Sequence, residues 1–146
     1  MKQFLKHIQL ETKKQFELVN ITAQVTAALA ESGIASGLAV VYCPHTTAAI
    51  RINHDEPLLA QDIMKALYRL VPTDVSYSHD LFEVRQEVAV NERSNGHAHV
   101  KSYLLGDSES FIIDQGKLIL GEKQSIFFVE LDGGRRRNYY VKLIGE

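Results

Sequence analysis

Two histidines two positions apart are the clearest candidates for metal or acid–base chemistry. The stretch HVKSYLL and the residues before it predict a strand, in which His97 and His99 leave the same face. Two neutral imidazoles spaced in this way can take two positions on a metal ion, and His45 can supply a third. We therefore predict a site for a divalent metal ion, Zn or Mg, on His45, His97 and His99. The alternative is that the paired histidines are solvated or hydrogen-bonded side chains without a ligand.

A second candidate lies directly after an apolar strand. His45 is followed by Thr46 and Thr47, where backbone amides and hydroxyls become free to bind an anion. The alternative is an ordinary connection whose threonines satisfy their own backbone. Cys43 is close enough to His45 to be considered as a nucleophile, but its apolar neighbours predict a buried structural residue.

Three consecutive arginines follow the turn Asp132-Gly133-Gly134. Alternate residues of a strand face apart, so Arg135 and Arg137 can address one ligand together. Guanidinium forks match phosphate oxygens, and we expect these two arginines to bind a small phosphorylated molecule together with the threonines. A solvated hairpin tip is the alternative.

Length and composition restrict the class of protein. The chain has 146 residues, 45% hydrophobic and 23% charged, which predicts a single domain over residues 1–146. A formal net charge of -2 gives no basic surplus, so we expect no nucleic-acid partner. The longest nearly apolar stretch, residues 37–43, is far shorter than the roughly 20 residues that span a bilayer, so we expect no membrane partner. The lone cysteine and the absence of a signal-peptide pattern predict a cytoplasmic protein.

Two main helices and a series of strands must position the candidate residues. Apolar residues recur at helical spacing between Asn20, a good N-cap, and Gly33, and again between Asp55, which can cap a second helix, and Pro72. Because no βαβ alternation repeats, we predict an α+β fold: a large mixed, mostly antiparallel β-sheet with the two helices packed on one side. The segments predicted as strands are KQFLKHIQL, GLAVVYC, AAIRIN, FEVRQEVAV, HVKSYLL, SESFIID, KLIL, QSIFFVEL and NYYVKLI.

Four segments together resemble the YjbQ-like family of small bacterial and archaeal proteins. They are GLAVVYCPHTTAAIRIN, NGHAHVKSYLLG, GKLILGEKQSIFFVELDGGRRR and the closing YYVKLIGE, and the likeness runs across nearly the whole chain. The resemblance implies a YjbQ-like α+β fold, a homotrimer and a secondary thiamin-phosphate synthase activity. It also carries site roles onto His45, Asn53, Asn95 and His99, which we expect to be catalytic.

The chain departs from the family pattern in two places. Many relatives have Gly-Thr-Trp-Gln where this sequence has Gly121, Glu122, Lys123 and Gln124, and the chain contains no tryptophan. Many also have Asn-Glu where this sequence has Asn53 and His54. The first departure removes an aromatic surface that would stack on a ring.

The leading hypothesis from these features is an enzyme that acts on a small phosphorylated substrate at a histidine-rich metal or acid–base site. The alternative is a non-catalytic trimeric module that binds a phosphorylated metabolite, and a third is an interaction protein in which the histidines are incidental. Apolar residues of the last strands, among them Phe127, Phe128, Tyr139 and Tyr140, are expected to be covered by adjacent subunits.

Overall fold

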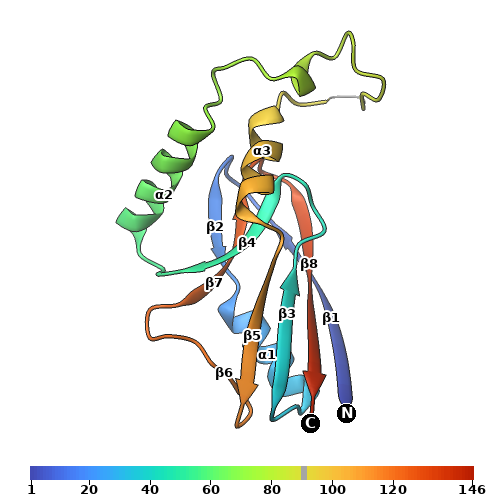
Figure 1. Cartoon of the computed structure of the whole chain (residues 1–146), viewed down its shortest axis with the longest axis vertical. Coiled ribbons are helices and arrows are strands. Elements are labelled where there is room, and N and C mark those ends of the chain that lie inside the picture. Colours follow the sequence, from blue (N-terminus) through green and yellow to red (C-terminus); the bar gives the residue numbers. More distant parts are fainter. Residues whose placement is uncertain (90–91) are drawn as a thin grey trace.

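The computed structural model describes residues 1–89 and 92–146. Figure 1 shows long strands below and two helices, coloured green and yellow, above them. The elements are β1 (Lys2–Glu11), β2 (Glu17–Asn20), α1 (Thr22–Ser32), β3 (Gly37–Tyr42), β4 (Ala48–Asn53), α2 (Pro57–Leu70), the 3-10 turn η1 (Ser78–Asp80), α3 (Gly96–Leu105), β5 (Ser108–Asp114), β6 (Lys117–Leu118), β7 (Ser125–Glu130) and β8 (Arg136–Gly145).

The strands form two antiparallel sheets. The larger has five strands in the order β1-β8-β3-β5-β6, and the smaller has three in the order β2-β7-β4. All described strand pairs are antiparallel. The predicted α+β class with mostly antiparallel strands is therefore confirmed, although the strands are divided between two sheets and a third α-helix is present.

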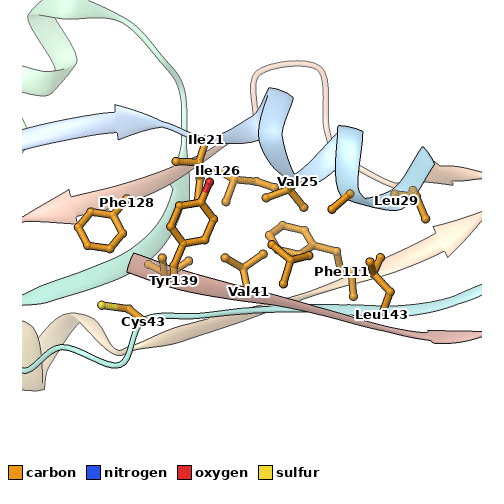
Figure 2. Close-up of a cluster of buried hydrophobic side chains, with 14 of the residues drawn as sticks. Ile21, Val25, Leu29, Val41, Cys43, Phe111, Ile126, Phe128, Tyr139 and Leu143 are labelled. Carbon is orange, nitrogen blue, oxygen red and sulfur yellow. The ribbon is translucent and has the colours of Figure 1, made fainter. Parts of the chain in front are cut away.

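The core lies between α1 and the inner face of the five-stranded sheet. In Figure 2, Val25 and Leu29 of α1 point toward side chains of the sheet, among them Val41 and Phe111. The period of two along β8 buries Tyr139 and leaves its neighbours half-buried. Phe127 and Phe128 are also buried within this chain, so these three rings do not need an adjacent subunit to cover them, contrary to the prediction. Tyr140 is half-buried, and for it the prediction stays a prediction.

The two predicted helices are confirmed, with small differences at their ends. Helix α1 begins at Thr22, whose backbone N–H donates to Asn20 Oδ1 over 3.0 Å. Helix α2 is capped by the Glu56 side chain, which accepts from the N–H of Leu58. Asp55, the predicted cap, instead accepts a hydrogen bond of 2.8 Å from the Asn20 amide. Among the described residues no helix is both long and apolar enough to cross a membrane.

The stretch HVKSYLL is helical, which contradicts the predicted strand. It belongs to α3, which follows Asn95 and ends before Gly106. Its buried positions, His97, Ala98, Lys101 and Ser102, recur at the spacing of three to four residues that a helix requires. The predicted strand FEVRQEVAV is also wrong over residues 82–89, which form turns and bends, and its last residue lies outside the described part of the chain. Strand β2 was not predicted.

The outer face of the five-stranded sheet carries an exposed apolar row. Leu38 of β3 pairs with Ile112 of β5 and with Ile144 of β8, so the three side chains form one row across this face. Leu38 and Ile112 are 56% and 57% exposed. We call this row, together with Leu5 of β1, the outer apolar face.

Candidate functional site

Helix α3 sends its two histidines in different directions. Two residues advance a helix by about 200°, so His97 and His99 lie on nearly opposite sides of α3. His97 is buried, and its Nδ1 lies 2.7 Å from Nζ of Lys101 one turn later. His99 lines a pocket together with Thr46. The same-face geometry predicted for the pair is therefore wrong, because it depended on a strand.

His45 follows β3 and is fixed by the last strand. Its Nε2 accepts the backbone N–H of Asn138 over 3.0 Å, which leaves Nδ1 to carry the proton of the neutral ring. Burial lowers the pKa of His45, and the positive charge of Arg137 lowers it further. The pKa of His99 is also lowered, first by burial and then by the charge of His79, whose ring centroid is 4.5 Å away. Both imidazoles are therefore neutral at neutral pH.

Two adjoining pockets meet at Thr46 and His99. The first, of about 410 Å³, is lined by His45, Thr46, His99, Ser102, Tyr103, Gly106 and Asp107. The second, of about 310 Å³, is lined by Thr46, Thr47, Ala89, Glu92, Arg93, Asn95, His99, Arg135 and Arg137. We call the second the arginine pocket. The structure thus brings together most residues for which the sequence predicted a phosphate or catalytic role.

A buried ion pair supports the floor of the arginine pocket. Arg137 donates from Nε and Nη2 to the two carboxylate oxygens of Glu130, over 2.8 and 2.5 Å. Nη2 also donates to the carbonyl and hydroxyl oxygens of Thr47, and Thr12 donates to Glu130 over 2.6 Å. Burial would raise the pKa of Glu130, but the hydrogen bonds from Arg137 and Thr12 hold it below its usual value.

This network changes the role expected for two predicted phosphate ligands. Arg137 and Thr47 are both 6% exposed; they bind each other, and Arg137 also binds Glu130. Only Nη1 of Arg137 makes no hydrogen bond within the described part of the chain. The pair is therefore mainly a structural support, while Thr46, which is exposed, keeps a hydroxyl for a ligand.

A second carboxylate, Asp132, forms ion pairs with the two more exposed arginines of the site, Arg93 and Arg135. Its Oδ2 accepts from Arg135 Nη2 over 2.6 Å and from Asn95 Nδ2 over 2.8 Å. Arg93 lies 3.6 Å from Oδ1 of the same residue and donates to the Asp132 carbonyl. Burial would raise the pKa of Asp132, but hydrogen bonds from Asn95 and Arg135 lower it. Asp132 therefore stays ionised and fixes both basic side chains at the rim.

The turn that carries Asp132 must approach the loop between β1 and β2 closely. A Cβ atom on Gly133 would lie 2.1 Å from the carbonyl oxygen of Lys14, and one on Gly134 would lie 2.6 Å from that of Thr12. Backbone contacts this short exclude any side chain at these two positions. The two glycines thus allow the turn to hold Asp132 beside the arginines.

Comparison with known proteins identifies the family. The profile described as "UPF0047 protein YjbQ-like" matches residues 6–146. The chain belongs to this family. A UPF0047 protein of Methanocaldococcus jannaschii is 42% identical over 139 residues, 94% of this chain and 92% of that protein. YugU of Bacillus subtilis is 39% identical over 142 residues, 97% of this chain and 99% of YugU. A crystal structure of a YbjQ-like protein of unknown function from Sulfolobus solfataricus P2 has a TM-score of 0.90 at 36% identity and covers 99% of both chains.

Asn53 lies away from the two pockets, although the YjbQ-like resemblance gave it a catalytic role. It ends β4, whereas the pockets begin beside the first residue of that strand, Ala48. A strand of this length extends about 17 Å. Asn53 instead lines a small apolar pocket next to Leu67 of α2, and its Oδ1 accepts the N–H of His54. Within this chain it is not part of the candidate site.

The three histidines do not form the predicted metal site. His97 faces Lys101, which occupies its Nδ1. Across residues 1–89 and 92–146, no three histidine, cysteine, aspartate or glutamate side chains are grouped so that they could hold a metal ion. The residues present therefore do not fit a zinc-type site of three protein ligands. Cys43 is buried, as predicted, and burial raises the pKa of its thiol to about 11.

Sequence reasoning missed three residues of the site: Thr12, Arg93 and His79. Thr12 is 118 positions from Glu130 in the sequence. Arg93 and His79 belong to the connection between α2 and α3, where a strand was predicted in place of turns. A local signal existed only for Arg93, because it precedes the Asn95 segment that the YjbQ-like family shares.

Proposed function

We propose that this chain binds a small phosphorylated molecule, with the phosphate in the arginine pocket and the rest of the ligand toward His45. One observation carries the proposal. The arginine pocket combines basic side chains at its rim with the Thr46 hydroxyl and with a neutral histidine, His99. These groups bind phosphate oxygens and can exchange a proton with the group next to them.

The charge balance of the arginine pocket favours an anion. Among residues 1–89 and 92–146, Arg93, Arg135 and Arg137 form ion pairs with two carboxylates, Glu130 and Asp132. The lining residue Glu92 does not change this balance, because it forms an ion pair of 3.1 Å with Arg85. One positive charge is left over. The side chains of Arg93 and Arg135 are 43% and 34% exposed, so a ligand can reach them.

The reaction we propose to test first is the thiamin-phosphate synthase-like transfer. It would form a C–N bond between a thiazole nitrogen and a pyrimidine methylene and break the C–O bond to diphosphate, which leaves with the electron pair. Arg93 and Arg135 would neutralise charge on the leaving diphosphate, and neutral His45 and His99 would hold or move a proton. A divalent Mg or Zn ion is also proposed, as a metal brought by the substrate's phosphates rather than held by three histidines.

Binding without turnover is the second candidate function. Two features favour it: Asp132 already engages Arg135, and Arg137 is used in the fold. A module that only holds a phosphorylated metabolite needs the same pocket and no acid or base. The two candidates differ in product formation, not in affinity.

Calorimetric titration of the purified protein with inorganic pyrophosphate and with thiamin phosphate tests the proposal. Arg135→Gln should weaken binding roughly tenfold, since a charge-assisted hydrogen bond contributes about 1.5–3 kcal/mol. Arg136→Gln is the matched control, because the Arg136 side chain is 92% exposed and faces Glu11. Absence of binding, or equal losses in the two variants, would refute the arginine pocket as a phosphate site. Incubation with both substrate halves then separates a catalyst from a binding module.

The homotrimer implied by the resemblance is a further proposal, and we assign it to the outer apolar face. Exposed apolar rows of this kind mark protein–protein contacts. Leu38→Lys together with Ile112→Lys should dissociate the assembly, measured as molar mass by light scattering after size exclusion. Val84→Lys is the control, since Val84 is 74% exposed but lies on the connection between α2 and α3. A wild-type protein of monomer mass would refute the proposal.

A further inference from the structure

Asn95 carries a hydrogen-bond acceptor that lacks a partner at the arginine pocket. The residue is 6% exposed, and it is one of the residues that line this pocket. Its Oδ1 is buried and accepts no hydrogen bond from the described residues. A buried acceptor without a donor costs about 1–3 kcal/mol, so the site is destabilised until a donor is supplied.

The orientation of the Asn95 amide is fixed. Nδ2 donates to Oδ2 of Asp132 over 2.8 Å, and a flipped amide would place Oδ1 against that carboxylate. Asp132 Oδ2 also accepts from Arg135 over 2.6 Å. The Asn95 amide and the Arg135 guanidinium are therefore held on the same oxygen atom. The residue with the unpaired acceptor thus shares a carboxylate oxygen with a cation that we assign to the phosphate.

A second feature places an anion next to this acceptor. Asn95 precedes the first residue of α3, a helix of 10 residues, so the positive end of the helix dipole lies at the arginine pocket. An anion bound there by Arg135 and by the helix would approach Asn95, whose Oδ1 accepts hydrogen bonds and repels bare anionic oxygens. The only anionic ligands that satisfy both groups carry a proton of their own.

We propose that Asn95 is a specificity-determining residue that selects an oxyanion ligand carrying an O–H donor at or next to the anionic group. This inference rests on the proposed phosphate site and adds the chemical class of its ligand. An ammonium donor is disfavoured, because Arg93, Arg135 and Arg137 line the same pocket. A hydroxyl is also the smaller group, which suits an acceptor as buried as Asn95 Oδ1.

The O–H group can come from two sources, which two pairs of probes distinguish. Inorganic phosphate and sulfate are both dianions at about pH 8, but only phosphate retains a proton on oxygen. 2-Hydroxyethyl phosphate and propyl phosphate have the same number of heavy atoms, but only the first has an alcohol. Each pair holds size and charge nearly constant and changes the donor.

Calorimetric titration of the wild-type protein with the four probes is the test. We expect the protein to bind phosphate roughly tenfold more tightly than sulfate, or 2-hydroxyethyl phosphate roughly tenfold more tightly than propyl phosphate. A tenfold difference in affinity corresponds to one hydrogen bond to a buried acceptor. The pair that shows the preference identifies the source of the hydroxyl. Equal affinities within both pairs would overturn the inference and leave the phosphate site standing. No binding of any probe would overturn both.

The variant Asn95→Leu then assigns the preference to this residue. It removes the acceptor, together with the Nδ2 hydrogen bond to Asp132, at nearly constant volume. The loss of the Asp132 contact affects both probes of a pair alike, so the ratio of affinities within the preferred pair should fall to about one. Asn53→Leu is the matched control, because Asn53 is exposed and lies outside the arginine pocket, and it should keep the wild-type ratio. If Asn95→Leu retains the preference, another group selects the donor. If the variant fails to fold, the four wild-type titrations still decide the inference.

Discussion

Arg137 and Lys101 are two buried basic side chains with opposite surroundings. Arg137 is 6% exposed, and both its Nε and its Nη2 are bound by Glu130. Lys101 is 1% exposed, and no carboxylate within the described part of the chain forms an ion pair with it. Its Nζ contacts the His97 ring nitrogen and lies 4.1 Å from the centroid of the Tyr68 ring.

The difference in surroundings indicates that the buried charge of Arg137 stabilises this fold and that the buried charge of Lys101 destabilises it. The charge of Arg137 is balanced, so the cation joins β7, β8 and the start of β4. Lys101 gains only a cation–π contact and a neutral acceptor. Burial accordingly lowers its pKa to about 8. Removing the partner of the first cation should destabilise the protein, while removing the second cation should stabilise it.

The largest effect is expected from Glu130→Gln, which keeps the shape of the side chain but leaves Arg137 buried without a counter-charge. The free energy of unfolding should fall by about 3–5 kcal/mol. Urea unfolding at neutral pH measures this change. Arg136→Gln, one residue from Arg137 but exposed, should stay within about 0.5 kcal/mol of wild type. Similar losses in both variants would mean that the buried pair has no special role.

An effect of opposite sign is expected from Lys101→Met. Methionine fills a similar volume without a charge, so the free energy of unfolding should rise by roughly 1–3 kcal/mol at pH 7. The increase should appear as a higher urea midpoint with an unchanged slope. A loss of stability would show that the contacts of Lys101 with His97 and Tyr68 outweigh its burial.

The smallest effect is a pH dependence that separates the two cations. The pKa of Lys101 is lowered from 10.5 to about 8 on folding, so between these values the unfolded chain binds more protons. This group therefore makes the native state more stable as pH rises from about 8. Of the groups around it, His97 has a lowered pKa and Asp132 is ionised throughout, while Tyr68 has a raised pKa and titrates only at higher pH. Unfolding curves from pH 7 to about pH 9.5 should show the rise in wild type and not in Lys101→Met.

The sequence predicted much of the β structure because its signal is local. Strand β8 alternates with a period of two, so the expectation that Arg136 faces away from Arg137 is confirmed by their exposure. The α3 segment was predicted wrongly because its first residues fit both the period of two of a strand and the period of about 3.6 residues of a helix. The helical conformation places His97 and Lys101 against Tyr68 of α2. A single sequence does not reveal such a contact between two distant segments.

The sequence predicted which residue types form the candidate site, but not which of them are available to a ligand and which support the fold. Both Arg135 and Arg137 reach the arginine pocket, yet only the position of Glu130 shows that Arg137 is already neutralised. Thr12 joins this network from the other end of the chain. Long-range partners of this kind leave no periodic pattern in the sequence.

The contact between Thr12 and Glu130 has a consequence for protein synthesis. A ribosome must synthesise the chain through Arg137 before Arg135 and Arg137 can close on the loop that follows β1. Contacts this distant in the chain form slowly and leave strand edges open in the meantime. Translation products that stop before Arg135 would therefore contain every histidine of the candidate site and still lack the arginine pocket.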